Sequence, residues 1–62
     1  MTDLLEVTLD DMIAEVRREG QQRRQVYGRL VKDHKMNSRL ADRRIDVMDA
    51  LLAYLEQRKA LE

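Results

Sequence analysis

The stretch Asp33-His34-Lys35-Met36-Asn37-Ser38 is a short polar break between two long segments whose apolar residues recur at helical spacing. Asn37 is a favourable N-cap for a helix that begins at Ser38. The break is also as short as the usual connections between antiparallel neighbouring helices. The sequence therefore predicts an all-α chain with a single helical-hairpin domain over residues 1–62: a helix over about 9–33, a turn over about 34–37 and a helix over about 38–60.

The composition supports helices and indicates a need for a partner. The 62 residues include no Pro, no Cys, two Gly and one His, and good helix formers dominate the rest. A chain of this length buries only about 60% of the surface that its unfolded form exposes, so small domains commonly need a disulfide, a metal or oligomerisation. Without cysteine, and with His34 alone in the turn, we expect no disulfide, no metal site and no cofactor. Oligomerisation is the remaining way to stabilise a domain of this size.

The chain shows no segment that would address it to a membrane. Its longest apolar run, Ala50–Leu55, is far shorter than the roughly 18 residues that a membrane span needs. The first residues also lack the charged and apolar regions of a secretory signal. We therefore expect a cytoplasmic protein that makes no membrane contact.

The first helix has a clear start and one ambiguous position. Thr8 and Asp11 have the spacing of a capping box, which fixes where the helix begins. At Gly20 two interpretations stay open: a continuous helix in which Gly20 admits a bulky side chain of the other helix, or a break, because glycine costs about 1 kcal/mol in a helix interior. The apolar seam that contains it has heptad spacing, as in coiled coils, and comprises Leu9, Ile13, Val16, Gly20, Arg23, Tyr27 and Leu30.

The second helix has a wider apolar band than one neighbouring helix can cover. Its seam is Ala41, Ile45, Met48, Leu52 and Leu55, flanked by Leu40, Val47, Leu51 and Tyr54. If the hairpin pivots between residues 35 and 36, Gly20 faces Leu51 or Leu52. The same register predicts two groups of ion pairs: Arg17, Arg18 and Arg24 with Asp46 and Asp49, and Asp11 and Glu15 with Arg58 and Lys59.

The over-wide band leads us to expect a homodimer in which two hairpins pair into a four-helix bundle. The tyrosines Tyr27 and Tyr54 are candidate interface aromatics, although ordinary seam packing is the simpler interpretation of each. The complete set of predicted interface residues is Val16, Gly20, Tyr27, Leu30, Ile45, Val47, Met48, Leu51, Leu52, Tyr54 and Leu55.

Charge is distributed unevenly along the chain. Residues 1–16 carry five acids and no base, residues 17–44 ten bases and three acids, and residues 45–62 four acids and two bases. The hairpin tip is therefore basic and the open end acidic, which favours tip against open end when two hairpins pair antiparallel. A basic tip could bind nucleic-acid phosphates, although a solvated helix face is the simpler interpretation. The candidate phosphate-binding residues are Arg23, Arg24, Arg29, Lys32, Lys35, Arg39, Arg43 and Arg44.

No catalytic residues are expected. Asp42, Asp46, Asp49 and Glu56 are spaced three and four apart on one helix, so they lie on a solvated face and not in a pocket. The stretch 39–55 resembles the first helix of the all-helical chorismate mutases, but only as any amphipathic helix would. The further helices that would close such an active site have no counterpart here, so we reject that resemblance.

Another resemblance covers more of the chain, over about residues 9–55. It is carried by Arg23-Arg24-Gln25-Val26-Tyr27-Gly28-Arg29-Leu30-Val31, by Lys35-Met36 and by Ala41-Asp42-Arg43-Arg44-Ile45 through Met48. These segments resemble a group of small uncharacterised proteins encoded in phages and proteobacterial prophages. The resemblance implies a phage or prophage origin and brings no activity, cofactor or functional residue. We predict a small non-enzymatic interaction protein that self-associates and has a further, unidentified protein partner, with accessory nucleic-acid binding as the alternative.

Overall fold

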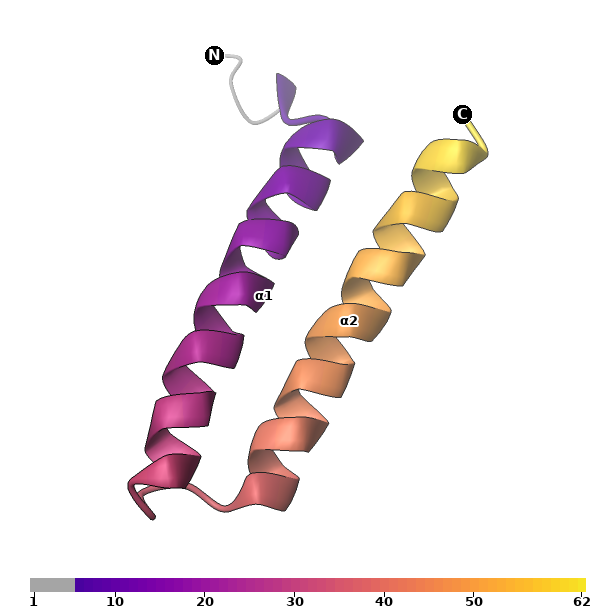
Figure 1. The fold of residues 1–62 in the computed structure, drawn as a ribbon. Coiled ribbons are helices and arrows are strands. Elements are labelled where there is room, and N and C mark those ends of the chain that lie inside the picture. The colour runs from indigo at the N-terminus through magenta and orange to yellow at the C-terminus, as the bar shows by residue number, and fades with distance from the viewer. Residues whose placement is uncertain (1–5) are drawn as a thin grey trace.

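The chain folds as an antiparallel pair of helices. In the computed structural model, which describes residues 6–62, α1 spans Leu9–Lys32 and α2 spans Ser38–Ala60, and this range contains no strand. The two helices run side by side in opposite directions, so the start of α1 and the end of α2 lie at the same end of the molecule (Figure 1). The predicted all-α hairpin is confirmed.

Short polar motifs fix where both helices begin. The backbone N–H of Asp11 donates to the Thr8 hydroxyl at 3.1 Å, and the Thr8 N–H donates to the Asp11 carboxylate at 3.1 Å. At the start of α2, the Asn37 side-chain oxygen accepts from the N–H groups of Arg39 at 2.8 Å and Leu40 at 3.3 Å. Both predicted caps are confirmed, and each satisfies amide donors that have no partner inside the helix.

The end of α1 is a Schellman motif. His34 has φ 60°, its N–H donates to the carbonyl of Val31 at 3.0 Å, and the Lys35 N–H donates to the carbonyl of Leu30 at 2.7 Å. These are the two hydrogen bonds that define the motif, with a left-handed residue that is usually glycine. Because Asp33 already serves as the C-cap, α1 ends at Lys32, one residue earlier than expected.

Helix α1 runs without a break through Gly20, so the continuous-helix interpretation is confirmed. A Cβ atom added at Gly20 would lie 3.4 Å from Cγ of Met48, which shows how closely α2 approaches. The expected neighbours, Leu51 or Leu52, are therefore wrong by about one helical turn. Methionine is long and unbranched, so it can fill the gap that the missing side chain leaves.

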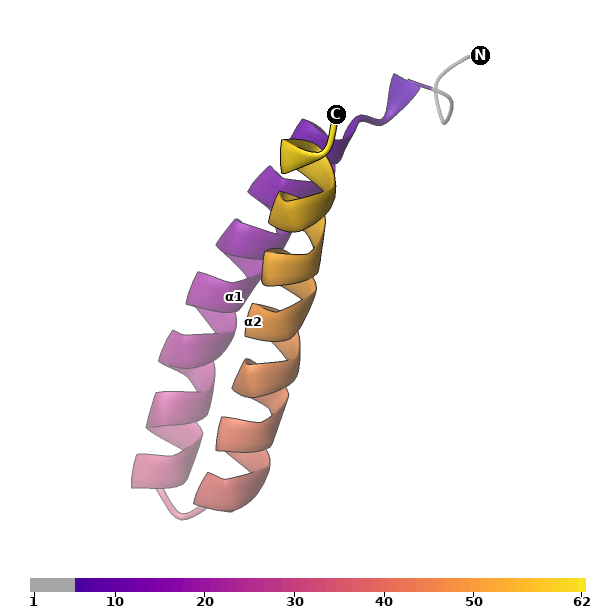
Figure 2. The same cartoon turned by 90° about the vertical axis from the view of Figure 1, so that its right-hand side faces the viewer.

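The hairpin is a single layer that buries little of itself. Its Cα atoms extend 44 × 26 × 12 Å, and the radius of gyration is 14.5 Å, whereas a compact domain of this length would have about 10.6 Å. Seen edge-on, one helix lies almost behind the other (Figure 2). Within residues 6–62 the buried hydrophobic side chains are those of Ile13, Ala41 and Leu55.

The exposed area of the chain also indicates that the hairpin buries little of its surface. The chain exposes 5180 Å², about 1,000 Å² more than the roughly 4,200 Å² expected of a compact monomer of 7.4 kDa. The hairpin is therefore less compact than an ordinary monomer of its mass.

Candidate interaction surface

Because the hairpin is one layer thick, it has two broad sides, and ion pairs between the helices occupy one of them. Arg17 Nη2 lies 2.5 Å from Glu56 Oε2, and Lys59 Nζ lies 3.2 Å from Asp10 Oδ2. Arg24 Nη2 donates to both oxygens of the Asp49 carboxylate, at 2.6 and 2.7 Å. Positions 10, 17 and 24 are seven residues apart and so share one side of α1. We call this the ion-paired side.

The structure corrects several predicted ion pairs. Arg24 does meet Asp49, but Arg17 reaches Glu56 instead of Asp46 or Asp49. Within α1, Arg18 bonds to Glu15, and the Asp11 carboxylate is held by the N-terminal cap. The expected pairing of Asp11 and Glu15 with Arg58 and Lys59 is therefore wrong, because these acids already have partners one turn away on their own helix.

These ion pairs shift the pKa values of three ionisable groups. The hydrogen bond from Arg18 holds the pKa of Glu15 below its ordinary value, and the same bond raises the pKa of Arg18. Hydrogen bonds to Asp10 and Glu62 raise the pKa of Lys59. All three groups are exposed to solvent, so their ion pairs contribute little to the stability of the hairpin.

The opposite side of the hairpin is apolar. Positions 12, 19 and 26 of α1 lie two residues beyond 10, 17 and 24, which places them about 200° around the helix from the ion-paired side. Positions 40, 47 and 54 of α2 repeat at the same seven-residue spacing. Six large hydrophobic residues in these stripes are between 39% and 57% exposed; they are Met12, Val26, Leu40, Val47, Leu51 and Tyr54. We call this the apolar side.

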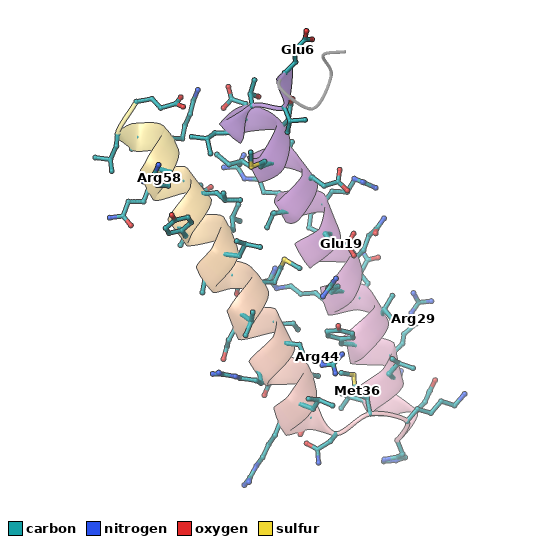
Figure 3. The ribbon with its side chains drawn as sticks, turned by 180° about the vertical axis from the view of Figure 1, so that it is seen from behind. Glu6, Glu19, Arg29, Met36, Arg44 and Arg58 are labelled. Carbon is teal, nitrogen blue, oxygen red and sulfur yellow. The ribbon has the colours of Figure 1, made fainter. Side chains whose placement is uncertain are left out.

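A few charged residues accompany the apolar side chains. Figure 3 views the hairpin from the apolar side, where Glu19 of α1 lies with Arg44 and Arg58 of α2. Arg23 Nε donates to Glu19 Oε1 at 3.3 Å, and the two side chains are 41% and 39% exposed. This half-buried pair is the one ion pair that the described residues place on the apolar side.

The apolar side is hollowed near the open end of the hairpin. A groove of about 400 Å³ is lined by Val7, Met12, Val16, Leu51 and Leu55, with the carboxylates of Asp11 and Glu15 at its edge. Its lining is aliphatic and offers neither a nucleophile nor a base beside one. Such a groove can receive the apolar side chains of another helix.

A second, more polar hollow lies at the tip. It has a volume of about 320 Å³, lies on the ion-paired side and contains no paired acid and base that could transfer a proton. Its lining residues are Arg24, Tyr27, Gly28, Val31, Ser38, Ala41, Asp42 and Ile45. Tyr27 and Ile45, both predicted interface residues, are half-buried here.

The predicted interface residues fall into two groups. Eight are buried or half-buried between α1 and α2: Val16, Gly20, Tyr27, Leu30, Ile45, Met48, Leu52 and Leu55. Of these, the half-buried Val16 and Leu30 lie at the edge that faces the apolar side, where Val16 lines the groove and Leu30 is five turns from Met12. Val47, Leu51 and Tyr54 are exposed on the apolar side and remain open to a partner. Met12, Val26 and Leu40 belong to the same surface but were not in the predicted set. Each of the three lies seven residues from another apolar or half-buried position, and this spacing could have identified them from the sequence.

The basic residues of the tip do not form one surface. Arg23 and Arg24 are engaged by Glu19 and Asp49. In the part of the chain that the structure describes, no ion pair forms to the remaining six candidates, Arg29, Lys32, Lys35, Arg39, Arg43 and Arg44. Arg29 points away from α2, whereas Arg44 lies on the apolar side (Figure 3). One straight phosphate backbone could therefore touch only some of them.

Comparisons with protein-family models, curated proteins and solved structures found no match for this chain. Neither α1 nor α2 combines the length and hydropathy needed to cross a bilayer. Among residues 6–62, no three His, Cys, Asp or Glu side chains gather where they could hold a metal ion. The apolar side is thus the feature of this molecule that a function must explain.

Proposed function

We propose that this chain is a small non-enzymatic interaction protein that self-associates through its apolar side into a dimeric four-helix bundle. The observation that carries the proposal is the exposure of six large hydrophobic side chains on one side of a hairpin whose other side is covered by ion pairs. Burying apolar surface contributes about 25 cal/mol per Å² removed from water. The apolar side is therefore where association is most favourable.

The exposed area matches what a dimer of this kind requires. The hairpin exposes 5180 Å², about 1,000 Å² more than a compact chain of its mass. A stable protein interface buries about 800 Å² per partner. Pairing two copies through their apolar sides would cover an area of that order and turn two single layers into one two-layered core.

Sedimentation equilibrium across micromolar concentrations, with circular dichroism on the same samples, tests the proposal. We expect a dimer whose helical signal falls as the dimer dissociates on dilution, because the isolated hairpin buries little. A fully helical monomer at low micromolar concentration would contradict it.

Accessory nucleic-acid binding is the second candidate function, and the six basic tip residues outside the ion pairs favour it. Contacts through phosphates alone predict binding to duplex and single-stranded nucleic acids that weakens steeply as salt rises. No binding at low salt would remove this candidate. It ranks second because the basic side chains point in different directions.

A phage or prophage origin and a cytoplasmic location stay proposals. The origin rests on the sequence resemblance, and the location on the shortness of the apolar runs in the sequence. Any further protein partner is likewise a proposal.

A further inference from the structure

Two apolar sides can meet in two symmetric ways: tip against tip, or the tip of one copy over the open end of the other. We infer that the occupant of the apolar side is a second copy of this chain docked tip over open end, with the two-fold axis at the level of Gln21 and Leu51. This inference rests on the proposed self-association and specifies its geometry.

The apolar stripe of α1 is symmetric about Gln21. Val16 and Val26 lie five positions on either side of it, and Met12 and Leu30 lie nine positions on either side. When two copies of α1 cross antiparallel at Gln21, each of these positions meets its apolar counterpart in the other copy. A tip-against-tip dimer places α1 over α2 instead and makes no use of this symmetry.

The ion pair between Glu19 and Arg23, on the same stripe of α1, is also symmetric about Gln21. Glu19 and Arg23 lie two positions on either side of Gln21 and are already 3.3 Å apart within one chain. In the antiparallel arrangement, Glu19 of each copy comes opposite Arg23 of the other. Four alternating charges then close a ring, so these half-buried groups keep opposite charges beside them after they lose water.

The stripe of α2 is symmetric about Leu51. Leu51 meets Leu51 of the second copy, while Val47, four positions before it, comes opposite Tyr54, three positions after it. Two matches are unfavourable: Arg44 with Arg58, seven positions on either side of Leu51, and Leu40 with Glu62, eleven positions on either side. The two arginines are long side chains whose charged ends can reach solvent past an apolar contact.

The two centres of symmetry lie at similar heights, as a single two-fold axis requires. The contacts of Gly20 with Met48 and of Asp10 with Lys59 place Gln21 opposite residues 47 and 48, whereas the long side chains of Arg24 and Arg17 reach partners that would place it opposite residue 52. Leu51 lies within this range, at most about 6 Å along the helix from either end. The stripes of α1 and α2 can therefore pair with their copies at the same time.

Charge along the hairpin selects between the two orientations. Residues 17–44, which include the tip, carry ten bases and three acids, whereas residues 1–16 at the open end carry five acids and no base. Tip against tip would stack the basic regions of two copies. Tip over open end instead brings the acids beside the groove, Asp11 and Glu15, towards the basic tip of the second copy.

Cysteine cross-linking tests the orientation, since the natural chain has no cysteine. We expect an equimolar mixture of Val16→Cys and Val26→Cys chains to form a disulfide-linked dimer under mild oxidation at least about fivefold more than either variant alone. The matched control mixes Ala14→Cys with Gln25→Cys, which lie at similar heights on the ion-paired side of α1, and should give no more than background.

Distance measurement between two labels gives an independent readout. A spin label on Ser38→Cys marks the tip without touching the apolar side. Ser38 is thirteen residues from Leu51, so tip over open end predicts a distance between labels of about 40 Å. Tip against tip predicts about 20 Å or less, the distance across neighbouring helices.

The outcomes separate this inference from the proposed function. A long label distance with the Val16→Cys to Val26→Cys disulfide supports both. A dimer in sedimentation with a short label distance and no such disulfide overturns the orientation and leaves self-association standing. A monomer in sedimentation overturns self-association, and the orientation with it.

Discussion

The two sides of this hairpin use the same helical register in different ways. On the ion-paired side, Asp10, Arg17 and Arg24 each find a partner on α2 of their own chain. On the apolar side, Val47 and Tyr54 are exposed by 55% and 57% and have no such partner within residues 6–62. The first side forms its contacts within one molecule, whereas the second leaves large apolar side chains exposed to solvent.

The two sides also differ in how much free energy their contacts can contribute. Exposed ion pairs contribute about 0.2–1 kcal/mol each, so the ion-paired side aligns the helices without holding them together strongly. A large apolar side chain contributes about 1.5–3 kcal/mol when it is fully buried. Changes on the apolar side should therefore have larger effects than equal changes on the ion-paired side.

The largest effect is expected from Leu51→Lys. This change replaces the apolar residue at the proposed two-fold axis with a charge, and each dimer contains it twice. We expect the dissociation constant of the dimer to rise at least about a hundredfold, measured by sedimentation equilibrium.

Ala53→Lys is the matched control for that change. Ala53 is exposed on the same helix, one turn from both Asp49 and Glu56 on the ion-paired side. A lysine there gains acidic neighbours, and the dissociation constant should change less than threefold. Equal effects of the two substitutions would show that the apolar side is not the interface.

The next largest effect concerns the seam between the helices. A side chain at Gly20 must displace Met48, because a Cβ atom there already lies 3.4 Å from Met48 Cγ. Gly20→Leu should lower the free energy of unfolding by about 1–3 kcal/mol in chemical denaturation at fixed protein concentration.

Gly28→Leu provides the comparison, since a Cβ atom at Gly28 meets nothing within 4 Å. Leucine is a better helix former than glycine, so this variant should be more stable by up to about 1 kcal/mol. If Gly20→Leu were equally stabilising, the close approach of the two helices at Gly20 would be wrong.

The features that the sequence predicted correctly are local ones. The capping box at Thr8, the cap at Asn37 and the apolar periodicity each depend on residues within a turn or two, and together they predict two helices and their starts. The sequence left open whether α1 continues through Gly20, and the structure shows that it does.

The features that the sequence did not predict depend on how the two helices are placed against each other. Whether Gly20 meets Met48 or Leu51, and whether Arg17 meets Asp49 or Glu56, depends on a shift of about one turn, or 5.4 Å. Each helix pattern is consistent with either register. The separation into two sides was not predicted either, although it could have been inferred from the spacing of Met12 and Val26, fourteen residues apart, and of Leu40, Val47 and Tyr54, seven residues apart.

A further prediction concerns the turn, which belongs to neither the ion-paired side nor the apolar side. His34 adopts φ 60°, a conformation that costs a residue with a Cβ about 1–2 kcal/mol and costs glycine nothing. His34→Gly should raise the free energy of unfolding by about 1 kcal/mol in thermal or chemical denaturation. Lys35→Gly, at a neighbouring position without positive φ, should lower it, and a gain from both would contradict the role assigned to His34.

A smaller effect is expected on the ion-paired side itself. Arg24 binds both oxygens of the Asp49 carboxylate, which is the best geometry among the ion pairs between the helices. A double-mutant cycle of Arg24→Ala and Asp49→Ala should give a coupling of about 0.2–1 kcal/mol that shrinks as salt rises. The control cycle of Arg29→Ala with Asp49→Ala should give no coupling, since Arg29 points away from α2 (Figure 3).

The smallest effect is the pH dependence of stability, which reports the same exposed charges. The pKa of Glu15 is lowered by Arg18, so its contribution is present above the pKa of the unfolded chain and is lost as pH falls through the folded value. The pKa of Lys59 is raised by Asp10 and Glu62, so its contribution is present below the unfolded pKa and is lost as pH rises through the folded value. Glu15→Gln should therefore flatten the acid limb of the melting-temperature profile, and Lys59→Gln the alkaline limb, each by no more than about 2 °C, because exposed charges are screened by solvent. A larger loss at neutral pH from either variant would mean that these pairs hold the hairpin together, and the division of roles between its two sides would fail.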